Sequence, residues 1–374
     1  MSDEKQIERI MSGKTWRDFC DTLKKAGDVI LREKSPADPL DRAEGFRYLS
    51  RIMRATVEAF VEYSDPLAPV LFRPIHETAK MGADNPDNYY QHATIRGDCE
   101  YRITGARGTV HHITFGTYKG NYGMAGPSGE TGFLAGRALR MKSDGTFEII
   151  LSAEKKGENW LKISPETSSL IVRQTFADRQ HESIADLSIE RIGGNGKPSP
   201  FTPERFDAAL AMAGNIMFGA ATFFANWAEG FMSHVNELPL FNPARSTAAH
   251  GDPTITYYHS YWRLEPGQEL VIEVTPPPCE AWNFQLNNHW MESLDYRYHK
   301  IWVNQKTARY RADGSVRIIV SAADPGVDNW IDTVGHTRGT MLFRWVRADN
   351  PVQPGCRVVD LESLNPQHRG QTHE

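Results

Sequence analysis

Two stretches of the chain are diverged copies of one another, which limits the fold to an architecture that contains one module twice. RMKSDGTFEIILSAEKKGENW at residues 140–160 matches RYRADGSVRIIVSAADPGVDNW at residues 309–330. The clearest matches are Asp144-Gly145 with Asp313-Gly314 at an offset of 169 (313 minus 144), and Asn159-Trp160 with Asn329-Trp330 at an offset of 170 (329 minus 159). Insertion of a single loop residue explains this drift.

The similarity continues on both sides of these stretches. LIVRQTFAD at residues 170–178 matches MLFRWVRAD at residues 341–349, and Tyr89-Tyr90 aligns with Tyr257-Tyr258 at an offset of 168 (257 minus 89). Each copy carries Asp-Gly between β-rich runs, which predicts a hairpin because both residues tolerate positive φ. Several such strands in about 100 residues predict a module of two packed sheets.

We therefore predict a mainly β protein with added helices: two tandem jelly-roll-like β-sandwich modules, an N-terminal helical region and an inter-module helix. A chain of 374 residues is long enough for several domains. The predicted divisions are a helical N-terminal region at 1–80, a first module at 81–195, a helical insertion at 196–248, a second module at 249–350 and a polar tail at 351–374.

Capping residues mark two of the expected helices. Asp38-Pro39 places a side-chain oxygen before a proline of the first turn, and Thr202-Pro203-Glu204 opens the helical insertion in a similar way. Residues 208–228 of the insertion contain no charged residue and are long enough to cross a bilayer. Because this stretch is rich in Ala and Gly and contains two asparagines, we favour a buried helix over a membrane span.

The charge balance and the N-terminus narrow the classes of partner and compartment. Lys and Arg number 42 against 47 Asp and Glu, a net charge of −5 without the basic excess that nucleic acids or anionic membranes attract. The start MSDEKQIERI lacks the apolar run of a secretory signal, so we expect a cytoplasmic protein with reduced cysteines. A small-molecule ligand is the expected partner, and a homo-oligomer stays open.

Features shared by both copies are expected to be scaffold, whereas features of one copy are candidates for a site. We interpret the shared Asp-Gly, Asn-Trp and RxxxAD motifs as a turn, a core tryptophan and a strand-edge ion pair. The second copy alone contains CEAWNFQLNNHWMESLDYRYHKIWVN at residues 279–304. Alternation along a strand would place Asn283, Gln285 and Asn287 on one face, where their amides face either a hydroxylated ligand or solvent.

Ionisable residues crowd into the same passage and supply candidates for acid and base chemistry. Glu292 and Asp295 would divide into a protonated acid and an ionised base. Tyr296 or His336 would be the catalytic partner, and His336 is included because the matching first-copy loop NWLKISPETSS has no histidine. The candidates for substrate contact are Asn283, Gln285, Asn287, Asn288, Trp290, Arg297 and His299. The alternative is that these residues are structural features of a strand end.

No cofactor or metal is expected from the sequence. The histidines have no recognised ligand spacing, and the adjacent residues His111 and His112 would point to opposite faces of a strand. The chain also lacks a phosphate-binding glycine loop, a nucleotide fingerprint and a GxSxG elbow.

The passage NHWMESLDYRYH, followed by HKIWVNQKTARYRADGSVRIIVSAADPGVDNWIDTVGHTRGTM, resembles the family catalogued as domain of unknown function 1214. The upstream stretch DNPDNYYQHATIRGDCEYRITGARGTV resembles the N-terminal part of longer family members. Together the resemblance covers roughly residues 70–348. It implies two β-sandwich or jelly-roll modules, similar in outline to bacterial peptide N-glycanases, and brings no activity with it.

From these residues we predict an enzyme that performs acid/base hydrolysis or elimination on a hydroxylated, for example carbohydrate-like, small molecule. It would be a soluble hydrolase or lyase. Two alternatives stay open: a non-catalytic protein that binds a ligand with its aromatic and amide surface, and a scaffold or assembly protein that uses its sheet faces.

Overall fold

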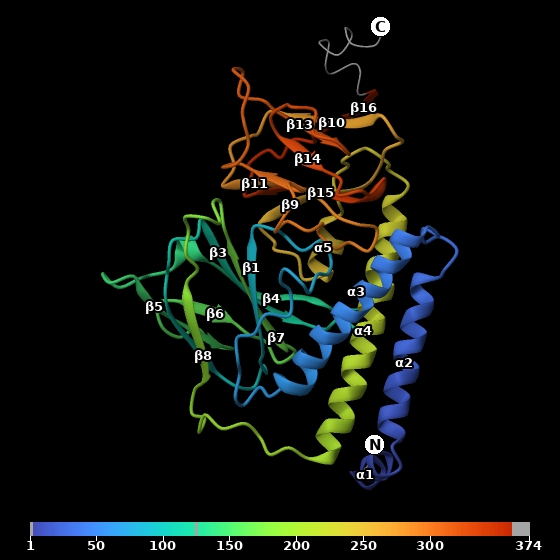
Figure 1. The fold of residues 1–374 in the computed structure, drawn as a ribbon. Helices are drawn as coiled ribbons and strands as arrows, with labels where there is room; N and C mark the ends of the chain where they lie inside the picture. Colours follow the sequence, from blue (N-terminus) through green and yellow to red (C-terminus); the bar gives the residue numbers. More distant parts are fainter. Residues whose placement is uncertain (1–2, 123, 125, 361–374) are drawn as a thin grey trace, which may run out of the picture. The chain divides into compact units, whose positions relative to one another are not determined.

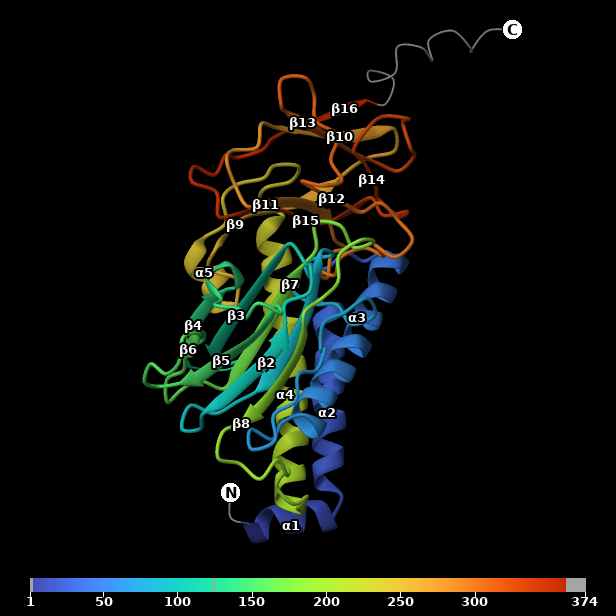
Figure 2. The ribbon, with the colours of Figure 1, turned by 90° about the vertical axis from the view of Figure 1, so that its left-hand side faces the viewer.

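The computed structural model describes residues 3–122, 124 and 126–360. It contains N-terminal helices, a long middle helix and two β modules, each made of two four-stranded sheets (Figures 1 and 2). By compactness the chain divides into two units. Unit 1 comprises Met1–Lys80, Asp87–Phe223 and Thr247–Gly251, and unit 2 comprises Met81–Pro86, Phe224–Ser246 and Asp252–Glu374. Each unit contains one module.

The N-terminal helices are α1 (Asp3–Met11), α2 (Lys14–Ile30) and α3 (Pro39–Val57), and α3 continues into a π-helical turn, Glu58–Glu62. The predicted cap of α3 is confirmed, because the Asp38 side chain accepts a hydrogen bond from the backbone N–H of Asp41. A proline occupies the first turn, as predicted.

The middle helix α4 (Pro203–Phe231) begins at the predicted proline and runs beside α2 in both views (Figures 1 and 2). It is long and apolar enough to cross a membrane by composition, and 56% of its most apolar window is buried inside the protein. A Cβ atom on Gly214 would lie 3.1 Å from Cδ2 of Phe19 on α2. Gly214 therefore permits close packing of α4 against α2. A short helix, α5 (Pro243–Ala248), follows.

The first module consists of sheets with the strand orders β1-β7-β3-β4 and β6-β5-β2-β8. Its strands are β1 (Asn88–Thr94), β2 (Tyr101–Ala106), β3 (His112–Lys119), β4 (Gly129–Ala135), β5 (Thr146–Ser152), β6 (Trp160–Lys162), β7 (Ser169–Thr175) and β8 (Asp186–Arg191). A 3-10 turn, Gly136–Ala138, follows β4. Both sheets contribute to one core that includes Tyr101, Phe115 and Leu151.

The second module repeats this arrangement with the strand orders β9-β15-β11-β12 and β14-β13-β10-β16. Its strands are β9 (Ile255–Arg263), β10 (Gln268–Val274), β11 (Ala281–Leu286), β12 (Trp302–Asn304), β13 (Val316–Ser321), β14 (Trp330–Asp332), β15 (Arg338–Val346) and β16 (Gly355–Asp360). Its core includes Trp262, Phe284 and Trp345.

The strand registers extend the duplication over all eight strands and correct one alignment. Tyr90 lies opposite Arg173 on β7, and Tyr257 lies opposite Arg344 on β15. The structural offset between β1 and β9 is therefore 167 (257 minus 90), one residue less than the pairing of the two Tyr-Tyr dipeptides predicted.

The shared Asp-Gly motifs form turns, as expected. In the first module Asp144 Oδ1 accepts a 2.9 Å hydrogen bond from the backbone N–H of Thr146. In the second module Asp313 Oδ1 accepts a 2.9 Å bond from the N–H of Ser315. The glycines that follow have φ values of 80° and 79°, the left-handed conformation that this turn requires.

The shared Asn-Trp motifs clamp the hairpin to the sheet. Asn159 Nδ2 donates to the carbonyl oxygens of Arg140 and Glu148, both at 2.8 Å. Asn329 Nδ2 donates to the corresponding carbonyl oxygens of Arg309 (2.8 Å) and Arg317 (2.9 Å). The tryptophans that follow are only partly buried, so the expected core tryptophan is instead a ring at the sheet edge.

The strand-edge ion pair expected of the RxxxAD motif does not fit the second module. Arg344 is buried, whereas Asp349 is exposed. The polar tail expected from residue 351 includes β16, which pairs with β10. The part of this predicted tail at residues 361–374 lies outside the described residues.

Candidate functional site

Strand β11 carries the polar passage of the second module, and its side chains alternate as predicted. Trp282, Phe284 and Leu286 belong to the module core. Asn283 and Gln285 point to the opposite face, where they are 4% and 0% exposed. These two amides therefore face a buried environment and not solvent.

Arg344 of β15 organises that buried face. Its Nη1 donates to Asn283 Oδ1 at 3.2 Å and to Gln285 Oε1 through a short hydrogen bond, and its Nη2 donates to the carbonyl oxygen of Ala83 at 2.7 Å. Gln285 Nε2 in turn donates to Asn287 Oδ1 at 2.6 Å. The predicted amide row thus holds an arginine and a short backbone stretch, Met81–Pro86, which the sequence did not connect to the passage.

The first module has an arginine at the same sheet position. Arg173 of β7 donates to Tyr118 Oη at 2.9 Å and to the carbonyl oxygen of His250 through a short hydrogen bond. Its neighbour on the opposing strand is Tyr90, as Tyr257 is for Arg344. In both modules a buried guanidinium therefore donates a hydrogen bond to a carbonyl oxygen of a short stretch that is distant in sequence: Thr247–Gly251 in the first and Met81–Pro86 in the second.

Asn288 and Glu292 meet in a tight turn. Asn288 Oδ1 accepts from the backbone N–H groups of Trp290 (3.0 Å) and Glu292 (3.1 Å), and Asn288 Nδ2 donates to Glu292 Oε2 at 3.0 Å. Met291 has a φ of 56°, unusual for a residue with a side chain. Glu292 is 1% exposed, so its carboxylate is positioned to stabilise this turn.

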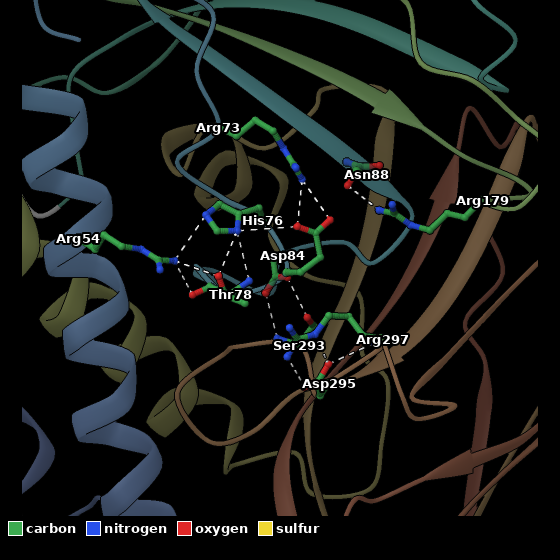
Figure 3. A network of polar contacts seen from close by, with 11 residues as sticks. Arg54, Arg73, His76, Thr78, Asp84, Asn88, Arg179, Ser293, Asp295 and Arg297 are labelled. Atoms are coloured by element: carbon green, nitrogen blue, oxygen red, sulfur yellow. Dashed lines mark hydrogen bonds and ion pairs between the residues drawn. The ribbon is translucent and has the colours of Figure 1, made fainter. Parts of the chain in front are cut away.

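Two carboxylates with different partners lie at the segment after this turn: Asp84 comes from the stretch Met81–Pro86, and Asp295 belongs to the segment itself (Figure 3). Asp84 Oδ1 accepts from the Ser293 backbone N–H at 3.0 Å, and Oδ2 accepts from its hydroxyl at 2.8 Å. Asp295 forms a two-point ion pair with Arg297, at 2.9 Å from Nε and 2.7 Å from Nη2. The hydrogen bond from Arg297 to Asp295 raises the pKa of that guanidinium.

His299 and Asp332 form the pair that best fits proton transfer. His299 Nδ1 lies 2.8 Å from Asp332 Oδ2, at the end of β14. Asp332 Oδ1 accepts a 2.7 Å hydrogen bond from the backbone N–H of Val334, which fixes the carboxylate. The imidazole side chain is 39% exposed and the carboxylate 19%. Lys162 occupies the corresponding place on β6 of the first module, so this pair is specific to the second module.

The remaining candidates lie elsewhere in the same unit. His336 is buried, and its Nδ1 lies 2.9 Å from the carbonyl oxygen of Thr333 in its own turn. Tyr296 packs edge-on against Trp302, with ring centroids 5.9 Å apart. Trp290 is fully buried. The end of β14 therefore contributes Asp332 to the pair with His299, while His336 of the loop that follows has a contact within its own turn.

Unit 1 contains a polar cluster that the sequence did not indicate (Figure 3). Arg54 Nη2 donates to the carbonyl oxygen of Thr78 at 2.7 Å and lies 3.5 Å from His76 Nε2. Arg73 forms an ion pair with Glu77 at 3.2 Å. Burial, followed by the charges of Arg54 and Arg73, lowers the pKa of His76 below its ordinary value. Within the described part of the chain, no group of three or more His, Cys, Asp or Glu residues is placed to hold a metal ion.

Comparison with known proteins gives a family and a close structural relative. The model of the family described as "Protein of unknown function (DUF1214)" matches residues 87–176 and 263–350, which lie in the two modules. The crystal structure of an uncharacterized protein from Burkholderia cenocepacia is 51% identical, with a TM-score of 0.93 over 95% of this chain and 99% of that chain. The VPA0106 protein from Vibrio parahaemolyticus is 13% identical, with a TM-score of 0.49 over 91% and 100%. No curated protein matches the sequence.

Proposed function

This chain belongs to the DUF1214 family of proteins of unknown function, and from the geometry of its second module we propose that it performs acid/base chemistry on a hydroxylated small molecule. The observation that carries the proposal is the contact of 2.8 Å between His299 Nδ1 and Asp332 Oδ2, in which the imidazole stays partly exposed. Imidazole is the side chain whose proton exchange best suits neutral pH.

The pair supplies a base whose orientation is fixed. Asp332 Oδ2 accepts a hydrogen bond from the Nδ1–H group of His299, which selects the neutral tautomer whose lone pair is on Nε2. Nε2 then takes a proton from a substrate hydroxyl or from water, and the imidazolium that forms returns a proton to the leaving group. Such a sequence of proton transfers serves both a hydrolysis and an elimination.

Neighbouring residues support a ring-shaped, hydroxylated substrate. Tyr298, adjacent to the proposed base, is 78% exposed, and an exposed aromatic ring suits stacking on a sugar ring. In this proposal Glu292 and Asp295 are positioning residues, because their carboxylates are bound by Asn288 and Arg297. The substrate class follows from this chemistry and not from the family.

The test is turnover of a panel of glycosides and sugar acids by the wild-type chain and by two variants. His299→Ala is expected to abolish turnover, and Asp332→Asn to lower kcat by about 10²–10⁴-fold because the carboxylate no longer selects the tautomer. Both variants are expected to keep the melting temperature of the wild type, since the pair is partly exposed.

His181→Ala is the matched control, because His181 Nδ1 lies 2.9 Å from Asp178 in the first module and its side chain is 77% exposed. This variant is expected to keep full turnover. Full activity in His299→Ala would contradict the proposal. Binding of a panel member without any turnover in the wild type would favour the non-catalytic alternative.

A further inference from the structure

The two modules contain equivalent cavities beside their Asp-Gly hairpins. In the first module a cavity of about 200 Å³ is lined by residues that include Arg140, Lys142, Glu148, Glu158 and Asn159. In the second module a cavity of about 170 Å³ is lined by residues that include Arg309, Arg311, Arg317, Asp328 and Asn329. These residues correspond pairwise at offsets of 169 (309 minus 140) and 170 (329 minus 159).

Scaffold bonds that both modules share fix the shape of these cavities. Each hairpin is held to its sheet by the asparagine of the Asn-Trp motif, which donates to one carbonyl on the hairpin side and one on the strand. The cavity is therefore a consequence of the duplicated fold. A difference between the two cavities then reflects their side chains and not their backbone.

The charged residues next to the cavity differ between the modules. In the second module Glu273 lies opposite Arg317 on the sheet, and it accepts contacts from Arg311 at 2.8 Å, from Arg317 at 3.9 Å and from Arg357 through a short hydrogen bond. One carboxylate thus faces three guanidinium groups. It holds them near the cavity without neutralising them all.

In the first module the pattern is reversed. Arg102 pairs with Glu148 at 2.9 Å and with Glu190 at 2.8 Å, so one guanidinium faces two carboxylates. Thr104 occupies the place of Glu273, because it lies opposite Glu148 on the sheet. The charge of the cavity and its sheet face therefore differs between the modules. The second module has four arginines and two carboxylates there: Arg309, Arg311, Arg317 and Arg357 with Glu273 and Asp328. The first module has three cations and three carboxylates: Arg102, Arg140 and Lys142 with Glu148, Glu158 and Glu190.

We propose that the cavity of the second module binds the phosphoryl group of a small molecule, at a site separate from His299. Guanidinium groups match phosphate oxygens in geometry as well as charge, and groups held in place beforehand lose less entropy on binding. A cavity of about 170 Å³ is smaller than sites that enclose a whole drug-sized ligand, roughly 300–1,000 Å³, so it suits one oxyanion group. Tyr310 lines the same cavity and is 46% exposed, which leaves a ring for the remainder of the ligand.

The test is a calorimetric titration of the full chain with inorganic phosphate and with a sugar phosphate. Arg311→Gln and Arg317→Gln are each expected to weaken binding of both probes at least tenfold. Glu273→Gln is expected to tighten it severalfold, because the competing negative charge is removed while the amide oxygen still accepts hydrogen bonds from the guanidinium groups. A gain in affinity cannot arise from loss of folding, so this variant keeps the test decisive even if an arginine variant is unstable.

The matched control is Lys142→Gln, which changes the corresponding position of the first module and is expected to leave affinity within twofold of the wild type. Added sodium chloride is expected to weaken binding to the wild type. The proposal fails if the wild type binds neither probe, if Arg311→Gln and Arg317→Gln both bind as the wild type does, or if Lys142→Gln loses as much affinity as they do.

Discussion

A single asparagine in each module joins hairpin and sheet, and removing its amide tests that role. We expect Asn159→Ala to lower the free energy of unfolding by about 1–3 kcal/mol, because two carbonyl oxygens lose the donor of a buried side chain. Asn329→Ala should cost about 0.5–1.5 kcal/mol from its hydrogen bonds, because these are more exposed. Asn329 also has a φ of 57°, which alanine tolerates less well. Urea denaturation measures the change. Asn350→Ala, at an exposed position, is the control and should leave the free energy of unfolding unchanged. Equal stability of all three variants would contradict a structural role of Asn159 and Asn329.

Single residues also show where prediction from sequence stopped. Alternation along one strand correctly placed Asn283 and Gln285 opposite the core, because that relation is local. Their partner Arg344 is distant in sequence, and its RxxxAD motif instead predicts a strand-edge ion pair. His299 was a candidate for substrate contact, but nothing in the sequence indicated that it meets Asp332 at 2.8 Å, because this contact depends on where β14 ends.

Helix α4 packs against α2 at a glycine, and enlarging that residue should separate the two helices. We expect Gly214→Leu to destabilise the chain by about 1–3 kcal/mol, because even a Cβ atom would lie 3.1 Å from Phe19 and 3.4 Å from Thr22. Gly27→Leu on α2 is the control, since nothing lies within 4 Å of a Cβ there, and better helix propensity should leave stability equal or higher. Thermal unfolding distinguishes the two. A Gly214 variant as stable as the wild type would contradict close packing.

Among the helices and strands, the features that could be predicted from the sequence are those that depend on neighbouring residues, such as helix starts. The cap at Asp38 and the start of α4 at Pro203 were predicted correctly, since capping depends on neighbouring residues alone. Strand β16 was missed because its sequence, GCRVVD, follows a polar loop and the strand pairs on one side only. An edge strand of this kind is defined by its partner β10 more than by its own pattern.

For the molecule as a whole, a buried histidine predicts sensitivity to acid. Burial, followed by the charge of Arg173, lowers the pKa of His250 to about 4, although Lys119 O opposes the shift. The unfolded chain binds this proton near pH 6.5, so stability is present above that pH and is lost as pH falls toward 4. We expect a loss of about 3 kcal/mol from this residue over that window.

Comparison of variants separates the loss of stability caused by His250 from the loss caused by protonation of carboxylates. His250→Gln should show a smaller drop in unfolding free energy between pH 7 and pH 4.5 than the wild type, whatever its stability at pH 7. His181→Gln, at a side chain that is 77% exposed, should keep the drop of the wild type. Equal pH dependence in the wild type and both variants would show that His250 is not protonated on unfolding.

The hydrogen bonds of Arg173 and Arg344 determine how the gene can be divided into segments that encode complete units. Arg173 holds the carbonyl of His250, and Arg344 holds that of Ala83. In each case the gripped stretch is flanked in the sequence by residues of the other unit. No single cut in the reading frame can therefore yield two halves that each encode a complete set of contacts. A cut between the two copies would therefore leave each unit without one of its stretches.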